Sequence, residues 1–160
     1  MSSQHIATIA WTLPAGVDAE AFRKGQYSRE HRWSFDGGVE VPASPSPAVV
    51  PTPWSNPAGV DPEEAFVAAV ASCHMLTFLW LASKQGLLVQ SYRDQAVGTL
   101  AKNENGVYWV NAITLHPQIA YAGEKKLTPQ EESALHHHAH EQCFIANSVK
   151  TAVTVQPAAV

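Results

Sequence analysis

One long apolar stretch, residues 61–86 with the sequence DPEEAFVAAVASCHMLTFLWLASKQG, constrains the fold of this chain more than any other segment. Asp61 and Glu64 have the spacing of a capping box, and Pro62 suits the first position of a helix because its missing N–H needs no partner there. Gly86 is suited to end a helix. The stretch therefore predicts a single helix over residues 62–85, about 36 Å long at about 1.5 Å per residue.

No charged side chain occurs between Ala65 and Ala82, so we expect this helix to be buried on most sides. Its first half carries small residues and its second half large ones, with Cys73 and His74 where the halves meet. Two simpler interpretations stay open. The uncharged run is at the lower length limit of a membrane span, and a lone cysteine in a core is often only a small hydrophobic residue.

The composition fits one domain over residues 1–160 of an oligomeric protein. The formal net charge is −4, with 15% charged and 46% hydrophobic residues, which favours a surface partly covered by another copy. The sequence has no Lys or Arg cluster, so we expect no nucleic-acid partner. Residues 1–13 lack a basic segment followed by a long apolar run. We therefore expect a cytoplasmic protein that does not associate with a membrane.

The remaining periodicity predicts an α+β chain. The turn Asp36-Gly37-Gly38 indicates a hairpin, and Thr128 and Glu131 repeat the capping pattern at the start of a second helix. Residues 87–101 and 107–116 are expected to form a further hairpin, followed or extended by residues 116–122. The other expected elements are strands at residues 5–13, 27–35, 39–41 and 149–155, a helical turn or loop at 14–22 and a helix at 128–142.

Residues 41–60 contain six prolines and are expected to be irregular. Because this segment is long, stiff and in places apolar, it is interpreted as a loop at the rim of a pocket, with a plain surface loop as the alternative. Just before it, alternation in residues 27–35 puts Arg29 on the same strand face as Tyr27 and Trp33. Such an arginine either serves a site or is only stacked on an aromatic ring.

Four histidines lie close together in the second helix, and His136, His140 and Cys143 share one helical face. This spacing resembles part of a zinc site, but a structural site needs four ligands and a catalytic one needs a glutamate between the pair. We therefore expect no metal and no cofactor, and interpret the histidines as a solvated polar face.

The two cysteines favour redox or nucleophilic work, with an inert role as the alternative. Cys143 follows a helix and is interpreted as beginning another turn, where backbone N–H groups would lower the pKa of its thiol. Cys73 lies inside a helix and would need a nearby cation, for which Arg29 is the best candidate.

The segment from Asp61 to Cys73, DPEEAFVAAVASC, resembles the N-P-E-x-L-F-x-A-x-x-x-A-C segment of the OsmC/Ohr family, which comprises organic hydroperoxide resistance and osmotically inducible thiol peroxidases. Residues 143–148, CFIANS, resemble that family's C-P-[VI]-S-N-[AS] segment, although Phe144 stands where a proline is usual. The resemblance extends over most of the chain. It implies an antiparallel sheet wrapped around a long central helix in an intertwined homodimer.

The resemblance also implies roles for four residues. Cys73 would be the peroxidatic thiol, Cys143 the resolving thiol, and Glu63 the acid that fixes the active-site Arg29. Arg32, on the other strand face, is the alternative to Arg29. The implied activity is reduction of organic hydroperoxides, with H2O2 as a further candidate, through a Cys73 sulfenic acid and a Cys73–Cys143 disulfide. An external dithiol, lipoyl-type or another thiol, would then reduce the disulfide.

Two alternatives remain at this point. One is a thiol/disulfide redox sensor or reductase, and the other is a non-enzymatic dimeric binding protein with an apolar cleft.

Helix geometry leads to the homodimer as well. Glu63 and Cys73 are ten residues apart on one helix, about 15 Å along its axis, so a straight helix cannot bring both to one arginine. Glu63 would then come from a second copy packed through small residues, unless a kink near Pro62 brings it round within one chain.

Overall fold

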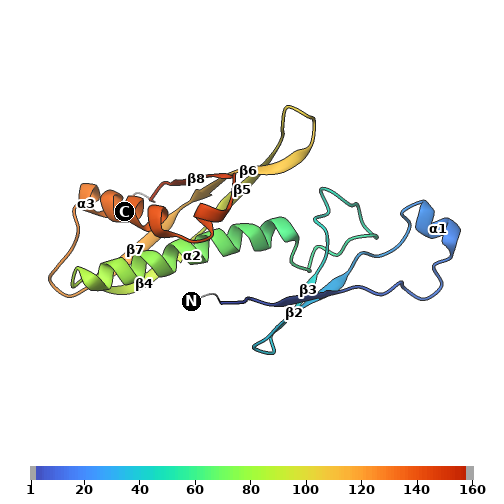
Figure 1. Ribbon diagram of the computed structural model, residues 1–160, viewed down its shortest axis with the longest axis horizontal. Helices are drawn as coiled ribbons and strands as arrows, with labels where there is room; N and C mark the ends of the chain where they lie inside the picture. The colour runs from blue at the N-terminus through green and yellow to red at the C-terminus, as the bar shows by residue number, and fades with distance from the viewer. Residues whose placement is uncertain (1–2, 158–160) are drawn as a thin grey trace. The chain divides into compact units, whose positions relative to one another are not determined.

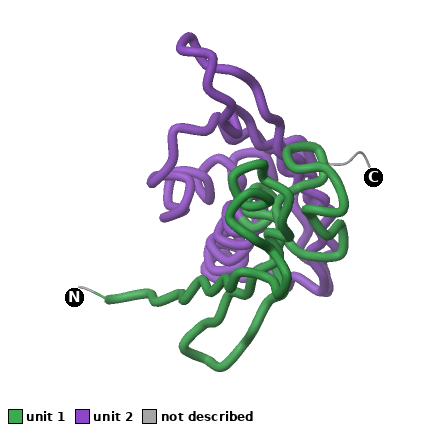
Figure 2. The backbone as a smooth tube through the Cα atoms, turned by 90° about the vertical axis from the view of Figure 1, so that its right-hand side faces the viewer, with its two compact units in different colours: residues 1–65 green, residues 66–160 purple. Residues whose placement is uncertain are grey.

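The computed structural model describes residues 3–157 (Figure 1). The chain forms two compact units, Met1–Ala65 and Phe66–Val160, coloured separately in Figure 2. Helices and strands are mixed along the chain, which confirms the α+β class. The expectation of a single domain stays a prediction.

The first unit holds a three-stranded antiparallel sheet with the strand order β1-β2-β3. Its hairpin is confirmed, since Phe35 donates its N–H to the Val39 carbonyl at 3.0 Å and Gly38 turns the chain with φ of 83°. The second strand is shorter than predicted because the Arg29 N–H bonds to the Trp54 carbonyl at 3.0 Å instead of to a strand. The elements are β1 Ala7–Ala10, α1 Ala19–Arg23, β2 His31–Phe35 and β3 Glu40–Ala43.

The proline-rich segment after β3 is irregular, as predicted, but it is tied down. The buried Ser44 hydroxyl accepts a 2.7 Å hydrogen bond from the Asn56 N–H. The Ser44 N–H in turn donates to the Val60 carbonyl at 3.1 Å. These bonds give the loop fixed partners in place of a β ladder.

The long helix α2, Pro62–Lys84, is confirmed within one residue. The Asp61 carboxylate accepts from the Glu64 N–H at 2.8 Å, and the Glu64 carboxylate accepts from the Asp61 N–H at 3.1 Å. Gly86, with φ of 71°, ends the helix. The capping box and the glycine thus fix both ends locally.

Only one stripe of α2 is buried within this chain, at Val70, His74, Phe78 and Ala82. Leu76 is 62% exposed and Trp80 is 53% exposed. The expectation of burial on most sides is therefore wrong for the single chain, because the small and large apolar residues on the other faces find no cover among residues 3–157. The length and composition of α2 would also suit a membrane span, a property that core helices share.

The strands of the second unit pair differently from the prediction. The expected strand over residues 87–101 is two strands that belong to different sheets, β4-β7 and β5-β6-β8. Only β5 and β6 form the predicted hairpin, while β6 and β8 run parallel. Sequence periodicity does not reveal which strand a segment will pair with, since the alternation is the same in either sheet. The strands are β4 Leu88–Asp94, β5 Val97–Lys102, β6 Tyr108–Leu115, β7 Pro117–Ala122 and β8 Ala152–Val155.

The second helix, α3 Pro129–Gln142, begins with the predicted capping box between Thr128 and Glu131. It packs on the C-terminal half of α2, where Phe78 and Ala82 share a core with Leu135 and Ala139. The 3-10 turn η1, Ala146–Ser148, then leads toward β8. This packing sets the two cysteines and three histidines of α2 and α3 near one another.

Candidate functional site

Cys73 and Cys143 come together in the second unit. Cys73 lies in the middle of α2 and is partly exposed, whereas Cys143 is the C-cap of α3 and is fully buried. Both are free thiols. Burial, and next the interaction with the Cys73 side chain, raise the pKa of the Cys143 thiol to about 11. The predicted pair is thus adjacent, with one accessible thiol and one protected thiol.

The backbone N–H groups near Cys143 lower the pKa of its thiol, as predicted, but their effect is smaller than that of burial. The Ala146 N–H donates to Cys143 Sγ at 3.4 Å, and this bond favours the thiolate. Burial disfavours the thiolate more strongly, so the pKa of Cys143 rises instead of falling. The expectation of a lowered pKa is therefore wrong in sign, because the sequence does not show how completely α3 and its neighbours enclose this thiol.

Arg29 belongs to the first unit and precedes β2. Its guanidinium lies over the Tyr27 ring, 4.2 Å from the centroid, and donates to the Gly25 and Tyr27 carbonyls at 3.2 Å each. The interpretation of a stacked arginine is thus confirmed. Arg29 also lines a cavity of about 330 Å³ whose other walls include Trp11 and Pro45. The proline-rich loop therefore does contribute to a pocket rim.

Arg32 has a different environment on β2. It forms an ion pair with Glu40 at 3.1 Å, and both side chains are 56% exposed. Arg32 also lines a cavity of about 330 Å³, whose other walls include Trp11 and Pro42, so both arginines border a cavity of the same volume. The pairing of either arginine with Cys73 stays a prediction.

Glu63 lies in the first turn of α2 and is half-buried. The helix runs from Pro62 through Cys73 as one element, so ten residues of helix separate the two side chains, about 15 Å along the axis. Its predicted role toward an arginine stays a prediction.

The interpretation of the histidines as a solvated face is wrong for His136. This side chain is 2% exposed and its Nδ1 lies 3.0 Å from Nε2 of His74, which is 1% exposed. The His136 ring also stacks on Phe78, with the centroids 4.5 Å apart. His137 and His138 are exposed, and His137 pairs with Glu141 at 3.2 Å. Within the histidine cluster, His136 is therefore buried against α2, whereas His137 and His138 face the solvent.

His74 was not expected to have a partner. The one indication in the sequence is its position inside a run with no charged residue, where a buried imidazole must find a hydrogen bond. Burial lowers the pKa of both His74 and His136 from 6.5 to about 4, so the pair is neutral at pH 7. His140 adds to the lowering at His74.

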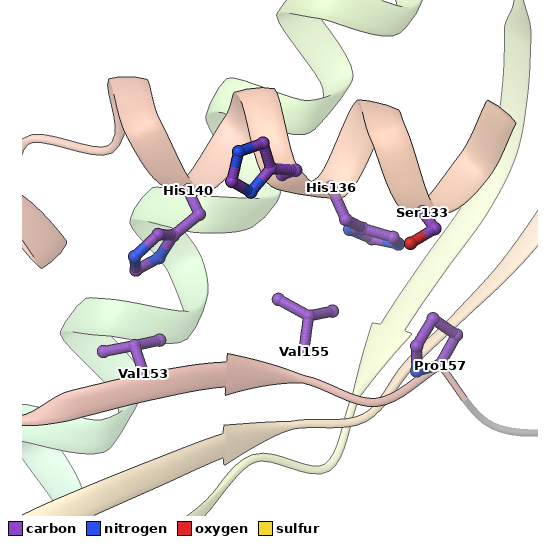
Figure 3. Close-up of a pocket in the computed structure, with 7 residues that line it drawn as sticks. Ser133, His136, His140, Val153, Val155 and Pro157 are labelled. Atoms are coloured by element: carbon purple, nitrogen blue, oxygen red, sulfur yellow. The ribbon is translucent and has the colours of Figure 1, made fainter. Parts of the chain in front are cut away.

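A cavity of about 200 Å³ lies beside this pair. In Figure 3, His136 and His140 extend from α3 toward Val153 and Val155 of β8. Among residues 3–157 no group of three or more histidine, cysteine or acidic side chains is arranged to hold a metal ion.

The comparisons with known proteins agree on one family. The model of the family described as OsmC-like protein matches residues 55–158. An OsmC-like protein of unknown function from Vibrio cholerae is 52% identical, with a TM-score of 0.91 over 98% of this chain and 100% of that one. No curated protein matches the chain.

More distant structures share the fold. An organic hydroperoxide resistance protein from Legionella pneumophila is 18% identical, with a TM-score of 0.66 over 97% of this chain and 95% of that one. Another organic hydroperoxide resistance protein, from Bacillus subtilis, is 21% identical, with a TM-score of 0.63 over 96% of this chain and 98% of that one.

Proposed function

Because this chain belongs to the OsmC-like family, we propose that it is a thiol-dependent peroxidase that reduces organic hydroperoxides to alcohols. The observation that carries the proposal is the adjacency of two free thiols with opposite environments, Cys73 partly exposed and Cys143 buried. Two structures of similar fold are named organic hydroperoxide resistance proteins. Their names support this reaction class.

The reaction follows from these two environments. The accessible Cys73 thiolate attacks one peroxide oxygen, the O–O bond breaks, and the alkoxide takes a proton to leave as the alcohol. Cys73 then holds a sulfenic acid, two electrons more oxidised than the thiol. The Cys143 sulfur attacks the Cys73 sulfur, its proton and the departing hydroxide leave as water, and a disulfide forms. An external dithiol returns both cysteines to thiols and becomes a disulfide.

The raised pKa of Cys143 supports the assignment of roles. A thiol with a pKa of about 11 is almost entirely protonated at pH 7 and is a poor first nucleophile. Next to a sulfenic acid it needs only to reach a neighbouring sulfur, which its position beside Cys73 allows. Arg29, within its aromatic cavity, is proposed to stabilise the Cys73 thiolate, and Glu63 to hold that arginine.

We also propose a homodimer in the cytoplasm. The exposed face of α2 carries small residues near Cys73 and large apolar residues beyond it, a surface suited to close packing of a second helix. A second copy of α2 on this face would supply Glu63 from the partner subunit.

The decisive experiment compares three proteins in peroxide reduction with a dithiol as the reductant. Wild-type protein should turn over repeatedly. Cys73→Ser should be inactive, and Cys143→Ser should consume about one peroxide per chain and retain a sulfenic acid that a dimedone-type reagent labels. Equal, mild losses in both variants would refute the assignment.

A binding protein with inert cysteines is the second candidate, since the burial of Cys143 alone fits it equally well. Titration of the Cys73 thiol separates the two. An ordinary pKa of about 8.5 or higher, together with no turnover of organic hydroperoxide, would favour the binding protein. Disulfide formation without peroxide turnover would instead indicate a redox sensor.

A further inference from the structure

The cavity between α3 and β8 has a polar side and an apolar side. Ser133, His136, His137 and His140 line it from the helix, and Val153, Val155 and Pro157 line it opposite. Val153 and Val155 are two residues apart on one strand and therefore face the same way. Figure 3 shows these two side chains opposite the imidazoles of His136 and His140. Neither cysteine lines this cavity.

The His136 ring is held in place from behind. Nδ1 lies 3.0 Å from His74 Nε2, and the ring stacks on Phe78. Its other nitrogen, Nε2, is buried and has no hydrogen-bond partner among the described residues. Nδ1 of His140 is likewise buried without a partner. A buried polar atom without a partner is energetically costly, so a molecule that bonds to it would be stabilised there.

The chemistry of the imidazole pair restricts that molecule. In a neutral His74–His136 pair, the shared bond uses one N–H and one bare nitrogen. If His74 donates the shared hydrogen, His136 Nε2 carries an N–H, and if His136 donates it, Nε2 is an acceptor. The free end of the pair can therefore match a group that both donates and accepts, such as a hydroxyl.

We propose that this cavity binds a small uncharged molecule with a short aliphatic body and a hydroxyl or hydroperoxyl end, which bonds to Nε2 of His136. The valines and the proline would cover the aliphatic body. A volume of about 200 Å³ equals that of about six or seven waters in the liquid, enough for a molecule of the size of tert-butanol. A charged ligand would lose its hydration against the neutral His136 ring and the apolar side of the cavity.

The site does not depend on the peroxidase proposal, because its lining excludes both cysteines and its test measures binding. Two sources share the ligand chemistry, an alcohol and an alkyl hydroperoxide. Alcohol binding would be tested on wild-type protein. Hydroperoxide binding would be tested on Cys73→Ser, in which no thiolate at position 73 consumes the hydroperoxide.

The probes are tert-butanol, tert-butyl hydroperoxide, tert-butylammonium and pivalate, which share one aliphatic body. The readout is the side-chain nitrogen spectrum of protein labelled with 15N-histidine. We expect saturable shifts of the His136 Nε2 signal with tert-butanol, with the hydroperoxide, or with both. The probe that binds more tightly identifies whether the natural ligand is an alcohol or an alkyl hydroperoxide. Both charged probes should bind at least tenfold more weakly.

Matched variants locate the site. Ser133→Leu fills the rim from an exposed position of α3 and should weaken binding at least tenfold, whereas Ala134→Leu, its exposed neighbour, should change it less than twofold. On β8, Val155→Phe fills the cavity, and Thr154→Phe places the same ring on the opposite strand face as the control.

Three results would overturn the proposal. One is the absence of a saturable shift with either uncharged probe, which would indicate that only water occupies the cavity. Another is equal binding of the charged and uncharged probes. The third is unchanged binding in folded Ser133→Leu and Val155→Phe proteins.

Discussion

The imidazoles of His74 and His136, 62 positions apart in the sequence, share a 3.0 Å hydrogen bond in the interior of the second unit. Each residue is about 1–2% exposed, and the rings stack with their centroids 5.3 Å apart. The bond links the middle of α2 to the middle of α3, one residue after Cys73 and seven residues before Cys143. It therefore fixes the two helices beside the thiol pair.

We expect the free energy of unfolding to fall as the pH is lowered from about 6.5 to about 4. The pKa of both histidines is about 4 in the folded protein and 6.5 in an unfolded chain, so the unfolded state takes up protons first on acidification. A shift in pKa from 6.5 to about 4 corresponds to about 3 kcal/mol for one ring, at about 1.4 kcal/mol per pKa unit. Denaturant unfolding at several pH values measures the slope.

The double variant His74→Leu, His136→Leu is the control for that prediction. It removes both titrating groups and fills similar space, so its stability should depend less steeply on pH in the same window. Each single variant leaves the remaining histidine with a buried nitrogen that has lost its partner. The free energy of unfolding at pH 7 should therefore fall in each single variant by more than half of the fall in the double variant. An unchanged slope in a folded double variant would contradict the assignment.

Mild oxidation should produce an intramolecular disulfide between Cys73 and Cys143. The Cys73 side chain contributes to the raised pKa of Cys143, which requires the two thiols to be close neighbours in the reduced protein. Peptide mapping by mass spectrometry without reductant, after one equivalent of organic hydroperoxide, would detect the linked peptides. Links between chains only would show that the resolving thiol lies elsewhere.

Replacing Arg29 by lysine should lower kcat/KM for hydroperoxide at least tenfold. Lysine keeps the charge but loses the planar stacking on Tyr27 and the paired bonds to the two carbonyls. Arg32→Lys is the matched control and should stay within about twofold, because its exposed ion pair with Glu40 contributes little. The reverse order of losses would move the site to Arg32.

Activity should be restored in mixed dimers of Glu63→Gln and Cys73→Ser chains. In the proposed dimer each site takes Cys73 from one chain and Glu63 from the other, so one site per mixed dimer keeps both. Co-purification through two different tags isolates the mixed dimers for assay. Inactive mixed dimers of folded chains, or a wild-type protein that sediments as a stable monomer, would rule out the shared site.

The sequence alone was sufficient for the elements that are fixed by local interactions. The two capping boxes, at Asp61 with Glu64 and at Thr128 with Glu131, join residues three apart, and Gly86 ends α2 through its own backbone conformation. Such contacts depend on neighbours in the chain and are visible as spacing. The motif resemblance around Cys73 and Cys143 further identified the family and the two thiols.

Tertiary packing decided what the pattern left open. Alternation in residues 87–101 is the same whether the segment is one strand or two, and only the packed sheets assign β4 to β7 and β5 to β6. Likewise, the pKa of Cys143 rises because burial outweighs the nearby N–H groups, and His136 is buried because α2 presents His74 to it. Burial and hydrogen bonding between distant residues depend on how helices and strands enclose a side chain. The spacing of residues along the sequence does not reveal this enclosure, because it records only which residues are neighbours in the chain.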